Sequence, residues 1–230
     1  MPGPRVHPLV VFDLDGTLID SRVDLANSAN EMLASYGGPP LPVDRITAMV
    51  GEGARVLVER AMAAAGVDAR FDEAFTRFLD VYGRRLLEHT RLYDGVDAAV
   101  RDAAAHGASL AVLTNKPSAH TKRILDGLGI APFFQWVIGG DETYPRKPDP
   151  SSLQALMSGA GAAADRTLFV GDSMIDVETA RRAGVRICVA LYGFGGIRGN
   201  LVPGDQDYLA RDALELNTVL TRWIHALGPS

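Results

Sequence analysis

Cysteine is almost absent from this chain of 230 residues. Cys188 is the only one, so no intramolecular disulfide can form, and the sequence gives no support for an oxidising compartment. No apolar run approaches the roughly 20 residues that a membrane-spanning helix needs. The first residues lead into a short strand-like segment without the apolar core of a signal peptide. We therefore expect a cytoplasmic protein that has no membrane partner.

Positive charge is also scarce. The formal net charge is -5 and the pI is near 5.5, which argues against nucleic acid as a partner because a phosphate backbone binds to a basic surface. Of the 23 basic residues only three are lysines: Lys116, Lys122 and Lys147. An acidic enzyme that handles anionic metabolites must create positive charge locally, with a metal ion or a few placed basic residues. We expect such a site in this chain.

Apolar runs of strand length alternate with helical patterns through most of the sequence. The predicted strands are 9–12, 110–113, 134–138, 168–170 and 185–191, and the predicted helices among them are 96–106, 117–128, 150–160 and 174–183. This alternation predicts an α/β fold with a doubly wound parallel sheet that is covered by helices.

The stretch from residue 19 to residue 90 has a different pattern. Its predicted helices are 21–36, 53–65 and 71–88, and it contains no convincing strand. We expect residues 19–90 to form an inserted helical cap domain, and residues 1–18 and 91–230 to form the α/β catalytic core.

Polar residues follow several predicted strands at the point where each strand ends. They are Asp13 and Asp15 after the first strand, Thr114 and Asn115 after the second, Lys147 in the loop after the third, and Asp172 after the fourth. Because ligands of parallel α/β sheets bind beyond the carboxyl ends of the strands, we expect these side chains to meet at one edge.

The aspartates at this edge predict a metal site. Asp13, Asp15, Asp172 and Asp176 would form a cluster of like charge, which is costly unless a cation neutralises it. Oxygen donors without His or Cys favour a hard ion, with Mg²⁺ first. A turn or helix N-cap is the alternative for Asp15, and a charge at a helix N-terminus is the alternative for Asp176.

The neighbouring polar residues are candidates for phosphate binding. Thr114 and Asn115 begin a predicted helix, where backbone N–H groups and a hydroxyl can hold a phosphate oxygen, although plain N-capping explains them as well. Lys147 stands out because arginine is the usual cation of this chain, and a lysine in a proline-rich loop suggests a requirement for a compact ammonium. Residue usage alone is the competing explanation.

Four segments resemble the motifs of the haloacid dehalogenase superfamily in order and spacing. They are Asp13-Leu14-Asp15-Gly16-Thr17-Leu18, Leu113-Thr114-Asn115-Lys116, Arg146-Lys147-Pro148-Asp149-Pro150, and Gly171-Asp172-Ser173 with Asp176. The resemblance covers nearly the whole chain and is nearest to the phosphoglycolate phosphatase group. It implies a Mg²⁺-dependent phosphatase that hydrolyses a small phosphorylated metabolite, with 2-phosphoglycolate as the first candidate.

The resemblance also implies a role for each motif residue. Asp13 attacks phosphorus and carries the phosphoryl group as an aspartyl-phosphate, and Asp15 protonates the leaving alkoxide and then activates water. The implied metal ligands are Asp13, Asp15 through its backbone carbonyl, and Asp172, with Asp176 in support. The implied phosphate-binding residues are Thr114, Asn115 and Gly16, and Lys147 is the implied balancing charge.

Two further residues bear on the choice of substrate. Dehalogenation expels a halide that needs no proton, whereas a phosphate ester expels an alkoxide that does, so Asp15 favours phosphate chemistry. In the predicted cap, Gly51-Glu52-Gly53-Ala54-Arg55 is the expected substrate-reading loop, with Arg55 paired to a substrate carboxylate. A solvated helix arginine is the alternative for Arg55.

Other functions share parts of this pattern. A sugar phosphomutase has the same aspartate pair and a helical cap, and sustained release of inorganic phosphate would distinguish a phosphatase from it. A receiver-like signalling domain also phosphorylates an aspartate on a parallel sheet, but such domains are much shorter than this chain. The sequence leaves open whether the protein acts as a monomer or as a homodimer.

Overall fold

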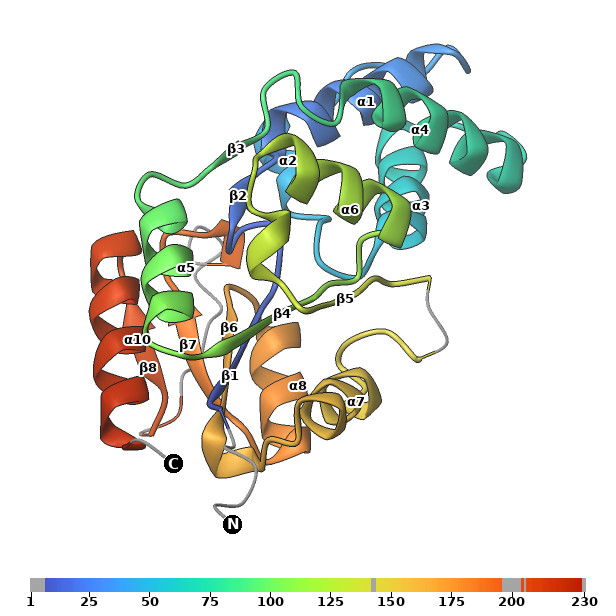
Figure 1. The fold of residues 1–230 in the computed structure, drawn as a ribbon. Coiled ribbons are helices and arrows are strands. Elements are labelled where there is room, and N and C mark those ends of the chain that lie inside the picture. The colour runs from blue at the N-terminus through green and yellow to red at the C-terminus, as the bar shows by residue number, and fades with distance from the viewer. Residues whose placement is uncertain (1–6, 142–143, 196–203, 205, 229–230) are drawn as a thin grey trace.

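A six-stranded parallel sheet forms the centre of the computed structural model, which describes residues 7–141, 144–195, 204 and 206–228 (Figure 1). The strands lie in the order β5-β4-β1-β6-β7-β8, and every neighbouring pair is parallel. Their bounds are β1 Leu9–Phe12, β4 Ser109–Leu113, β5 Trp136–Ile138, β6 Thr167–Gly171, β7 Arg186–Ala190 and β8 Tyr208–Ala210.

The strand order reverses at β1. From this central strand the chain builds β4 and β5 on one side, and then crosses to build β6, β7 and β8 on the other. Such a switch point leaves a crevice beyond the carboxyl ends of the strands, where α/β folds bind ligands. The predicted doubly wound α/β class is therefore confirmed.

Helices cover both faces of the sheet because side chains alternate along each strand. In β1, Val10 and Phe12 belong to the core that includes α5, α6 and α10, whereas Leu9 and Val11 belong to the core that includes α7 and α8. All four side chains are fully buried. These helices are α5 Val96–Ala105, α6 Ser118–Gly127, α7 Ser151–Ala160, α8 Met174–Ala183 and α10 Ala213–Ala226, with short 3-10 turns at Ala131–Phe133 and Ala164–Arg166.

Four more helices lie together beyond the carboxyl edge of the sheet (Figure 1). They are α1 Arg22–Ala34, α2 Val43–Thr47, α3 Ala54–Ala65 and α4 Phe71–Arg85. The first helix packs on the other three, and residues such as Met32, Leu57 and Phe78 bury their side chains between them. We call α1–α4 the cap helices.

A short antiparallel ribbon connects the cap helices to the sheet. Its strands are β2 Ile19–Asp20 and β3 Arg91–Leu92. The sequence predicts no strand between residues 19 and 90, and β2 corrects this, because two residues are too few to show a strand period. We propose the ribbon as the boundary between cap and core.

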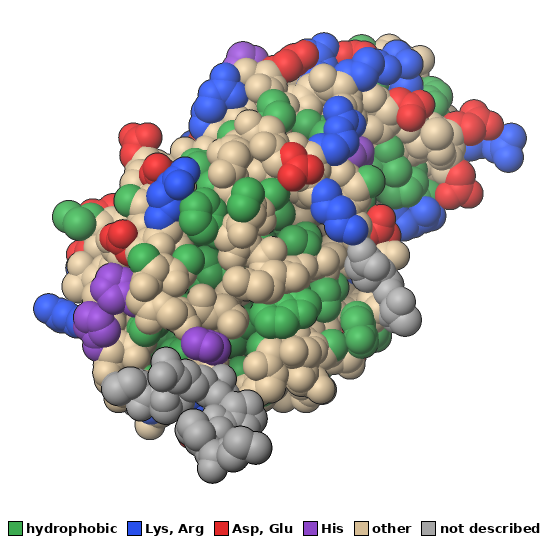
Figure 2. Space-filling model, viewed as in Figure 1, with side chains coloured by type: hydrophobic (Ala, Val, Ile, Leu, Met, Phe, Trp, Pro, Cys, Tyr) green, Lys and Arg blue, Asp and Glu red, His purple; other side chains and the backbone are tan. Residues whose placement is uncertain are grey.

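The surface carries charges of both signs. On the face drawn in Figure 2, Lys and Arg side chains lie among Asp and Glu side chains over the cap helices. Glu31, for example, is within 4 Å of Arg77, Arg84 and Arg85. Among the described residues no helix is long and apolar enough to cross a bilayer.

Candidate active site

The carboxyl ends of β1, β4 and β6 meet at the edge of the sheet that faces the cap helices. Asp13 follows β1, Thr114 follows β4 and Asp172 follows β6. Lys147 comes from the loop between β5 and α7, and Asp176 comes from the first turn of α8. All five are buried, with at most 8% of any residue exposed. The structure therefore brings together the polar residues that the sequence places at strand ends.

Lys147 lies between two of the carboxylates. Its Nζ atom is 2.9 Å from Asp13 Oδ1 and 2.6 Å from Asp176 Oδ1. Carboxylate oxygens of Asp13, Asp172 and Asp176 lie within 4.8 Å of one another, so the two carboxylates that contact the ammonium have a third beside them. Burial, opposed by Lys147 and reinforced by Asp176, raises the pKa of Asp13 to about 6. Burial and then the neighbouring carboxylates raise the pKa of Asp172 well above its ordinary value.

These residues fit a hard divalent cation. Asp13 Oδ1 is buried and accepts no well-oriented hydrogen bond, although Lys147 is close. An oxygen of this kind, beside two further carboxylates and without His or Cys, is the donor chemistry that Mg²⁺ prefers. The excess negative charge gives a physical reason for a cation at this point.

Gly16 allows the loop after β1 to approach Asp172. Its φ angle is +86°, and a Cβ atom added at this position would lie 2.4 Å from Asp172 Oδ2. No other residue could keep this turn without displacing a carboxylate of the cluster. Gly16 thus shapes the site through its backbone.

Asp176 belongs to the carboxylate cluster and also caps a helix. Its Oδ2 atom accepts hydrogen bonds from the backbone N–H of Ser173 (3.0 Å) and from Ser173 Oγ (2.6 Å), which completes a capping box at the start of α8. Its Oδ1 atom faces Lys147. The helix cap therefore fixes the carboxylate that supports the cluster.

Asp15 points away from this cluster. Both of its carboxylate oxygens lie 2.8 Å from Lys116 Nζ, and Oδ1 also accepts a 2.5 Å hydrogen bond from Ser21 Oγ. The expectation that Asp15 belongs to the metal group can therefore apply only to its backbone carbonyl. Its side chain stands apart from the three clustered carboxylates, in the pocket described below.

Asn115 is a structural link between three segments. Its amide donates to the carbonyls of Gly51 and Lys147, both at 3.0 Å, and its Oδ1 accepts from the backbone N–H of Lys147 at 2.9 Å. The side chain is thereby committed, so only the backbone N–H of Asn115 is left to serve the phosphate-binding role that the sequence predicts. Thr114 lines the pocket described below, and its hydroxyl lies close to the backbone N–H of Lys116.

Arg55 is not at the site, which corrects the sequence prediction. About half of its side chain is exposed, its Nη2 atom lies 3.2 Å from Asp72, and its guanidinium stacks on the rings of Phe71 and Phe75. The helical period explains this placement, because Ala54 and Leu57 turn one face of α3 toward the pocket and Arg55 lies on another.

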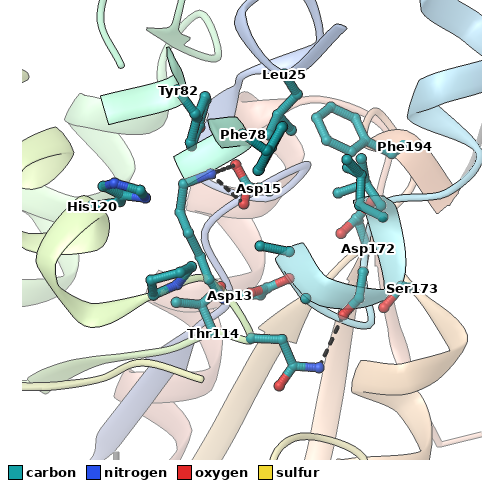
Figure 3. A pocket seen from close by; sticks show the side chains of 18 residues that line it. Asp13, Asp15, Leu25, Phe78, Tyr82, Thr114, His120, Asp172, Ser173 and Phe194 are labelled. Atoms are coloured by element: carbon teal, nitrogen blue, oxygen red, sulfur yellow. Dashed lines mark hydrogen bonds and ion pairs between the residues drawn. The ribbon is translucent and has the colours of Figure 1, made fainter. Parts of the chain in front are cut away.

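A pocket lies between the sheet edge and the cap helices (Figure 3). Asp13, Asp15 and Asp172 line it from the sheet side, and cap residues such as Leu25 and Phe78 line it from the other. Figure 3 shows Tyr82 and His120 beside Asp15, on the side away from Asp172 and Phe194.

Three pocket residues with titratable side chains are absent from the predicted site: Lys116, Tyr82 and His120. The scarcity of lysine is a signal that could have identified Lys116, as it did Lys147. Tyr82 and His120 lie on ordinary helical faces of α4 and α6, and nothing in the sequence distinguishes them from packing residues.

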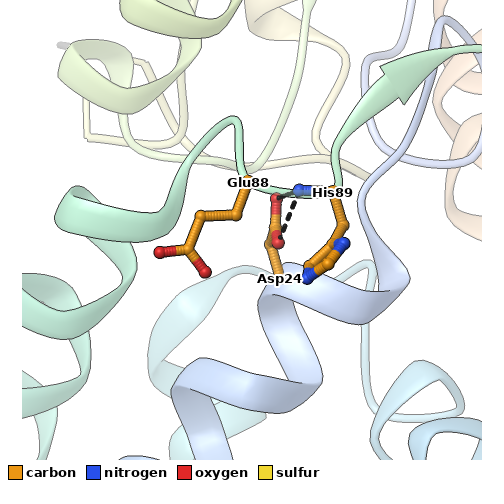
Figure 4. A group of neighbouring side chains, drawn as sticks. All are labelled: Asp24, Glu88 and His89. Carbon is orange, nitrogen blue, oxygen red and sulfur yellow. Dashed lines mark hydrogen bonds between the residues drawn. The ribbon is translucent and has the colours of Figure 1, made fainter.

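Asp24, Glu88 and His89 form a second group with metal-ligand chemistry (Figure 4). The buried Asp24 carboxylate accepts hydrogen bonds from the backbone N–H groups of His89 and Thr90 and from the Thr90 hydroxyl, at 2.7–3.0 Å. Glu88 and His89 are exposed. The Asp24 carboxylate thus holds the chain after α4 against α1. These hydrogen bonds give a structural reason for the position of the group.

Comparison with known proteins gives consistent results. Residues 10–190 match the family described as "Haloacid dehalogenase-like hydrolase". The chain is 44% identical over 192 residues to a phosphoglycolate phosphatase of Pseudomonas putida, covering 81% of this chain and 70% of that protein. It is 43% identical over 193 residues to a phosphoglycolate phosphatase of Rhodospirillum rubrum, covering 80% of each.

A solved structure shows the same arrangement of elements. The crystal structure of a predicted phosphoglycolate phosphatase from Haemophilus somnus 129pt superimposes with a TM-score of 0.86 at 31% identity, and the match covers 94% of this chain and 99% of that one.

Proposed function

This chain belongs to the haloacid dehalogenase-like hydrolases and is a phosphatase, and we propose that it hydrolyses 2-phosphoglycolate with Mg²⁺ through an aspartyl-phosphate on Asp13. The observation that carries the mechanism is the position of Asp13. It is a buried carboxylate at the end of the central strand, it lines the pocket, and it lies against Lys147.

In the first step Asp13 attacks phosphorus, and the bond between phosphorus and the ester oxygen breaks. Asp15 lines the same pocket and donates a proton to the leaving alkoxide. In the second step Asp15 takes a proton from water as that water attacks the aspartyl-phosphate, which releases inorganic phosphate and restores Asp13. Asp13 lies in the charged cluster and Asp15 lies beside Lys116, so the nucleophile and the acid–base group are separate in space.

The remaining groups hold the metal ion and balance the negative charge of the carboxylates and the phosphoryl group. Asp13, Asp172 and the Asp15 backbone carbonyl would hold Mg²⁺, with Asp176 in support. When bound, the cation would offset the negative charge of the carboxylates and of the phosphoryl oxygens. Lys147 supplies a fixed positive charge next to Asp13 and Asp176, and its burial keeps that charge from being screened by water.

The substrate is inferred from two observations. The relatives that match over most of this chain are named phosphoglycolate phosphatase. The pocket is also closed by apolar cap side chains such as Leu25, Leu57 and Phe78, which suits a small substrate with few polar groups besides its charges.

A panel of phosphorylated metabolites, assayed for released phosphate with Mg²⁺, tests the proposed substrate. We expect 2-phosphoglycolate to rank among the best substrates, with continuous release of phosphate. A sugar phosphate that ranks above it would overturn the substrate, and conversion of a sugar phosphate to its isomer without phosphate release would indicate a mutase.

The variant Asp13→Asn tests the covalent mechanism. The amide has nearly the same shape but cannot form the acyl phosphate, so we expect turnover to be lost while the circular dichroism spectrum is unchanged. Residual activity within about tenfold of the parent would rule out Asp13 as the nucleophile, because such a difference is only about 1.4 kcal/mol in the barrier.

A further inference from the structure

We propose that Lys116, Tyr82 and His120 form the subsite that binds the carboxylate of the substrate, so that this phosphatase reads an anionic group on the carbon next to the phosphate ester. The proposal rests on the proposed function, because it names the residues that recognise phosphoglycolate. It replaces Arg55, which lies outside the pocket.

Lys116 provides the charge. Among the described residues that line the pocket, it alone carries a permanent positive charge. Its side chain is only 4% exposed. Its Nζ atom lies 2.8 Å from each carboxylate oxygen of Asp15, so an opposite charge accompanies the buried ammonium.

One proton of this ammonium remains for a ligand. An ammonium has three donor protons, and the two oxygens of Asp15 account for two of them. On the cap side, Nζ lies 4.7 Å from the centroid of the Tyr82 ring. An aromatic face is a weaker partner than a carboxylate oxygen, so a substrate carboxylate can take this third position.

Tyr82 and His120 supply buried polar atoms with spare hydrogen-bonding capacity. Tyr82 Oη and His120 Nδ1 make no well-oriented hydrogen bond to the described residues, although Lys116 lies beside the Tyr82 side chain. Buried polar atoms in folded proteins are nearly always paired, so unpaired ones beside a pocket suggest a ligand that pairs with them. Burial and then the charges of Lys116 and Arg123 lower the pKa of His120 to about 4, so its ring is neutral and can present one N–H.

The two side chains come from different parts of the fold. Tyr82 belongs to cap helix α4, His120 belongs to α6 of the core, and their rings meet edge to face with centroids 5.4 Å apart (Figure 3). A carboxylate bound here would contact both the cap and the core. Recognition of the substrate would therefore favour contact between the cap helices and the core.

The location matches the length of the substrate. Lys116 follows the phosphate-binding Thr114 and Asn115 directly in the chain. In 2-phosphoglycolate only the ester oxygen and one methylene carbon separate phosphorus from the carboxylate. The group that recognises this carboxylate must consequently lie next to the phosphoryl site, and Lys116 does.

A pair of matched substrates tests the subsite. Carbamoylmethyl phosphate has the shape of 2-phosphoglycolate but carries a neutral amide in place of the carboxylate. We expect the parent to prefer 2-phosphoglycolate by about 10- to 100-fold in kcat/KM, as suits a lost charge-assisted hydrogen bond. In Lys116→Met this preference should collapse to within about threefold of unity.

The ratio of the two substrates separates recognition from damage, because loss of folding or of Asp15 function lowers both rates together. Lys122→Met is the matched control: the same substitution at an exposed lysine of α6 should leave the ratio at the parent value. Tyr82→Phe removes only a hydroxyl that makes no well-oriented hydrogen bond, so it should fold, and it should reduce the ratio several-fold.

The outcomes distinguish this proposal from the proposed function. If the parent prefers 2-phosphoglycolate while Lys116→Met and Tyr82→Phe both retain the parent ratio, the subsite is wrong and the proposed function stands. If Lys116→Met does not fold, the Tyr82→Phe ratio alone decides. If the parent turns over 2-phosphoglycolate poorly compared with other metabolites, the proposed function falls and the subsite falls with it.

Discussion

At the scale of single residues, Asp13 is where burial and charge oppose each other most directly. Three buried carboxylates lie together and Lys147 contacts two of them, and the folded protein holds a proton on Asp13 more tightly than an exposed aspartate would. Groups in an active site often lower the stability of the folded protein, because they are placed for chemistry. The loss of unfolding free energy caused by Asp13 should be measurable.

We expect Asp13→Asn to be more stable than the parent at pH 7 in the presence of chelator. The pKa of Asp13 is about 6 in the folded protein and 3.8 is its ordinary value. Below pH 3.8 the Asp13 carboxyl is protonated in both the folded and the unfolded protein, so it does not lower the unfolding free energy. As the pH rises from 3.8 to about 6, the carboxyl ionises first in the unfolded chain. The unfolding free energy therefore falls until the folded carboxyl has also ionised.

The neutral amide avoids that loss. At about 1.36 kcal/mol per pKa unit, the stability advantage of Asp13→Asn should reach roughly 1–3 kcal/mol at pH 7 and shrink toward zero near pH 4. Urea denaturation of both proteins at several pH values measures it. A difference that is independent of pH would show that Asp13 is not the strained group.

Residue scale is also where the sequence analysis both succeeds and fails. Asp13, Thr114 and Asp172 are predictable because the end of a buried strand fixes where a side chain lies. Lys147 lies in a loop, and only the scarcity of lysine distinguishes it in the sequence. Arg55 is misplaced because a helical residue can face the pocket or the solvent, and the loop register that decides between them is not visible in the sequence. For the same reason Tyr82 could not be identified.

At the scale of secondary-structure elements, the carboxylate cluster proposed to hold Mg²⁺ joins parts of the chain that are far apart. Asp13 belongs to the end of β1, Asp172 to the end of β6, and the capping box of α8 holds Asp176. A cation bound here would connect β1 to β6. A ligand that binds only the folded state stabilises it by RT ln(1 + [L]/Kd).

We therefore expect Mg²⁺ to raise the melting temperature of the parent and to be required for turnover. Asp172→Asn should lose most of this thermal shift, because a ligand from β6 is removed. Ca²⁺ should also bind the oxygen cluster but inhibit turnover, since the larger ion relaxes the octahedral geometry that Mg²⁺ imposes. Full activity in chelator would show that the carboxylates have another purpose.

The connection between α1 and the chain after α4 depends on Asp24. Its carboxylate is completely buried and accepts from two consecutive backbone N–H groups and a hydroxyl (Figure 4). We expect Asp24→Ala to lower the unfolding free energy by about 2–4 kcal/mol, because the donors of His89 and Thr90 lose their partner.

Denaturation of this variant measures the effect, and the exposed Glu88→Ala is its control, with an expected change below about 0.5 kcal/mol. In Asp13→Asn, where the first carboxylate cluster lacks one carboxylate, added Zn²⁺ or Mn²⁺ should not shift the melting temperature by binding to Asp24, Glu88 and His89. A metal-dependent shift that Asp24→Ala abolishes would contradict the structural role.

The elements themselves are predictable where they are long and strongly patterned. The core helices and the buried strands appear in the sequence within a few residues of their observed ends. The ribbon strands β2 and β3 and the five-residue helix α2 are too short to carry a period. The C-terminal β8 and α10 are not predicted either, and β8 is a half-exposed edge strand of three residues.

At the scale of the whole molecule, function depends on how the cap helices meet the sheet edge. The loop before α3 reaches the core at Asn115, which donates a hydrogen bond to the carbonyl of Gly51. Gly53 in this loop has a φ angle of +95°, and a Cβ atom there would lie 3.1 Å from the Asn115 carbonyl oxygen. The same asparagine also fixes the backbone of Lys147, so the contact joins the cap helices to the loop that carries Lys147.

We expect Gly53→Ala to push the cap away from the core and to lower kcat/KM on the order of tenfold. Gly66→Ala is the matched control, because Gly66 ends the same helix with a φ angle of +66° but has nothing within 4 Å of an added Cβ. Both variants add backbone strain of about 1–3 kcal/mol, yet only Gly53→Ala adds a methyl group at the junction. Steady-state assays well below the melting temperature, with the Mg²⁺-dependent thermal shift measured alongside, separate the two effects. The thermal shift should persist in both variants, since the carboxylates lie in the core. Equal activity of Gly53→Ala and Gly66→Ala would mean that the seating of this loop on Asn115 does not control turnover.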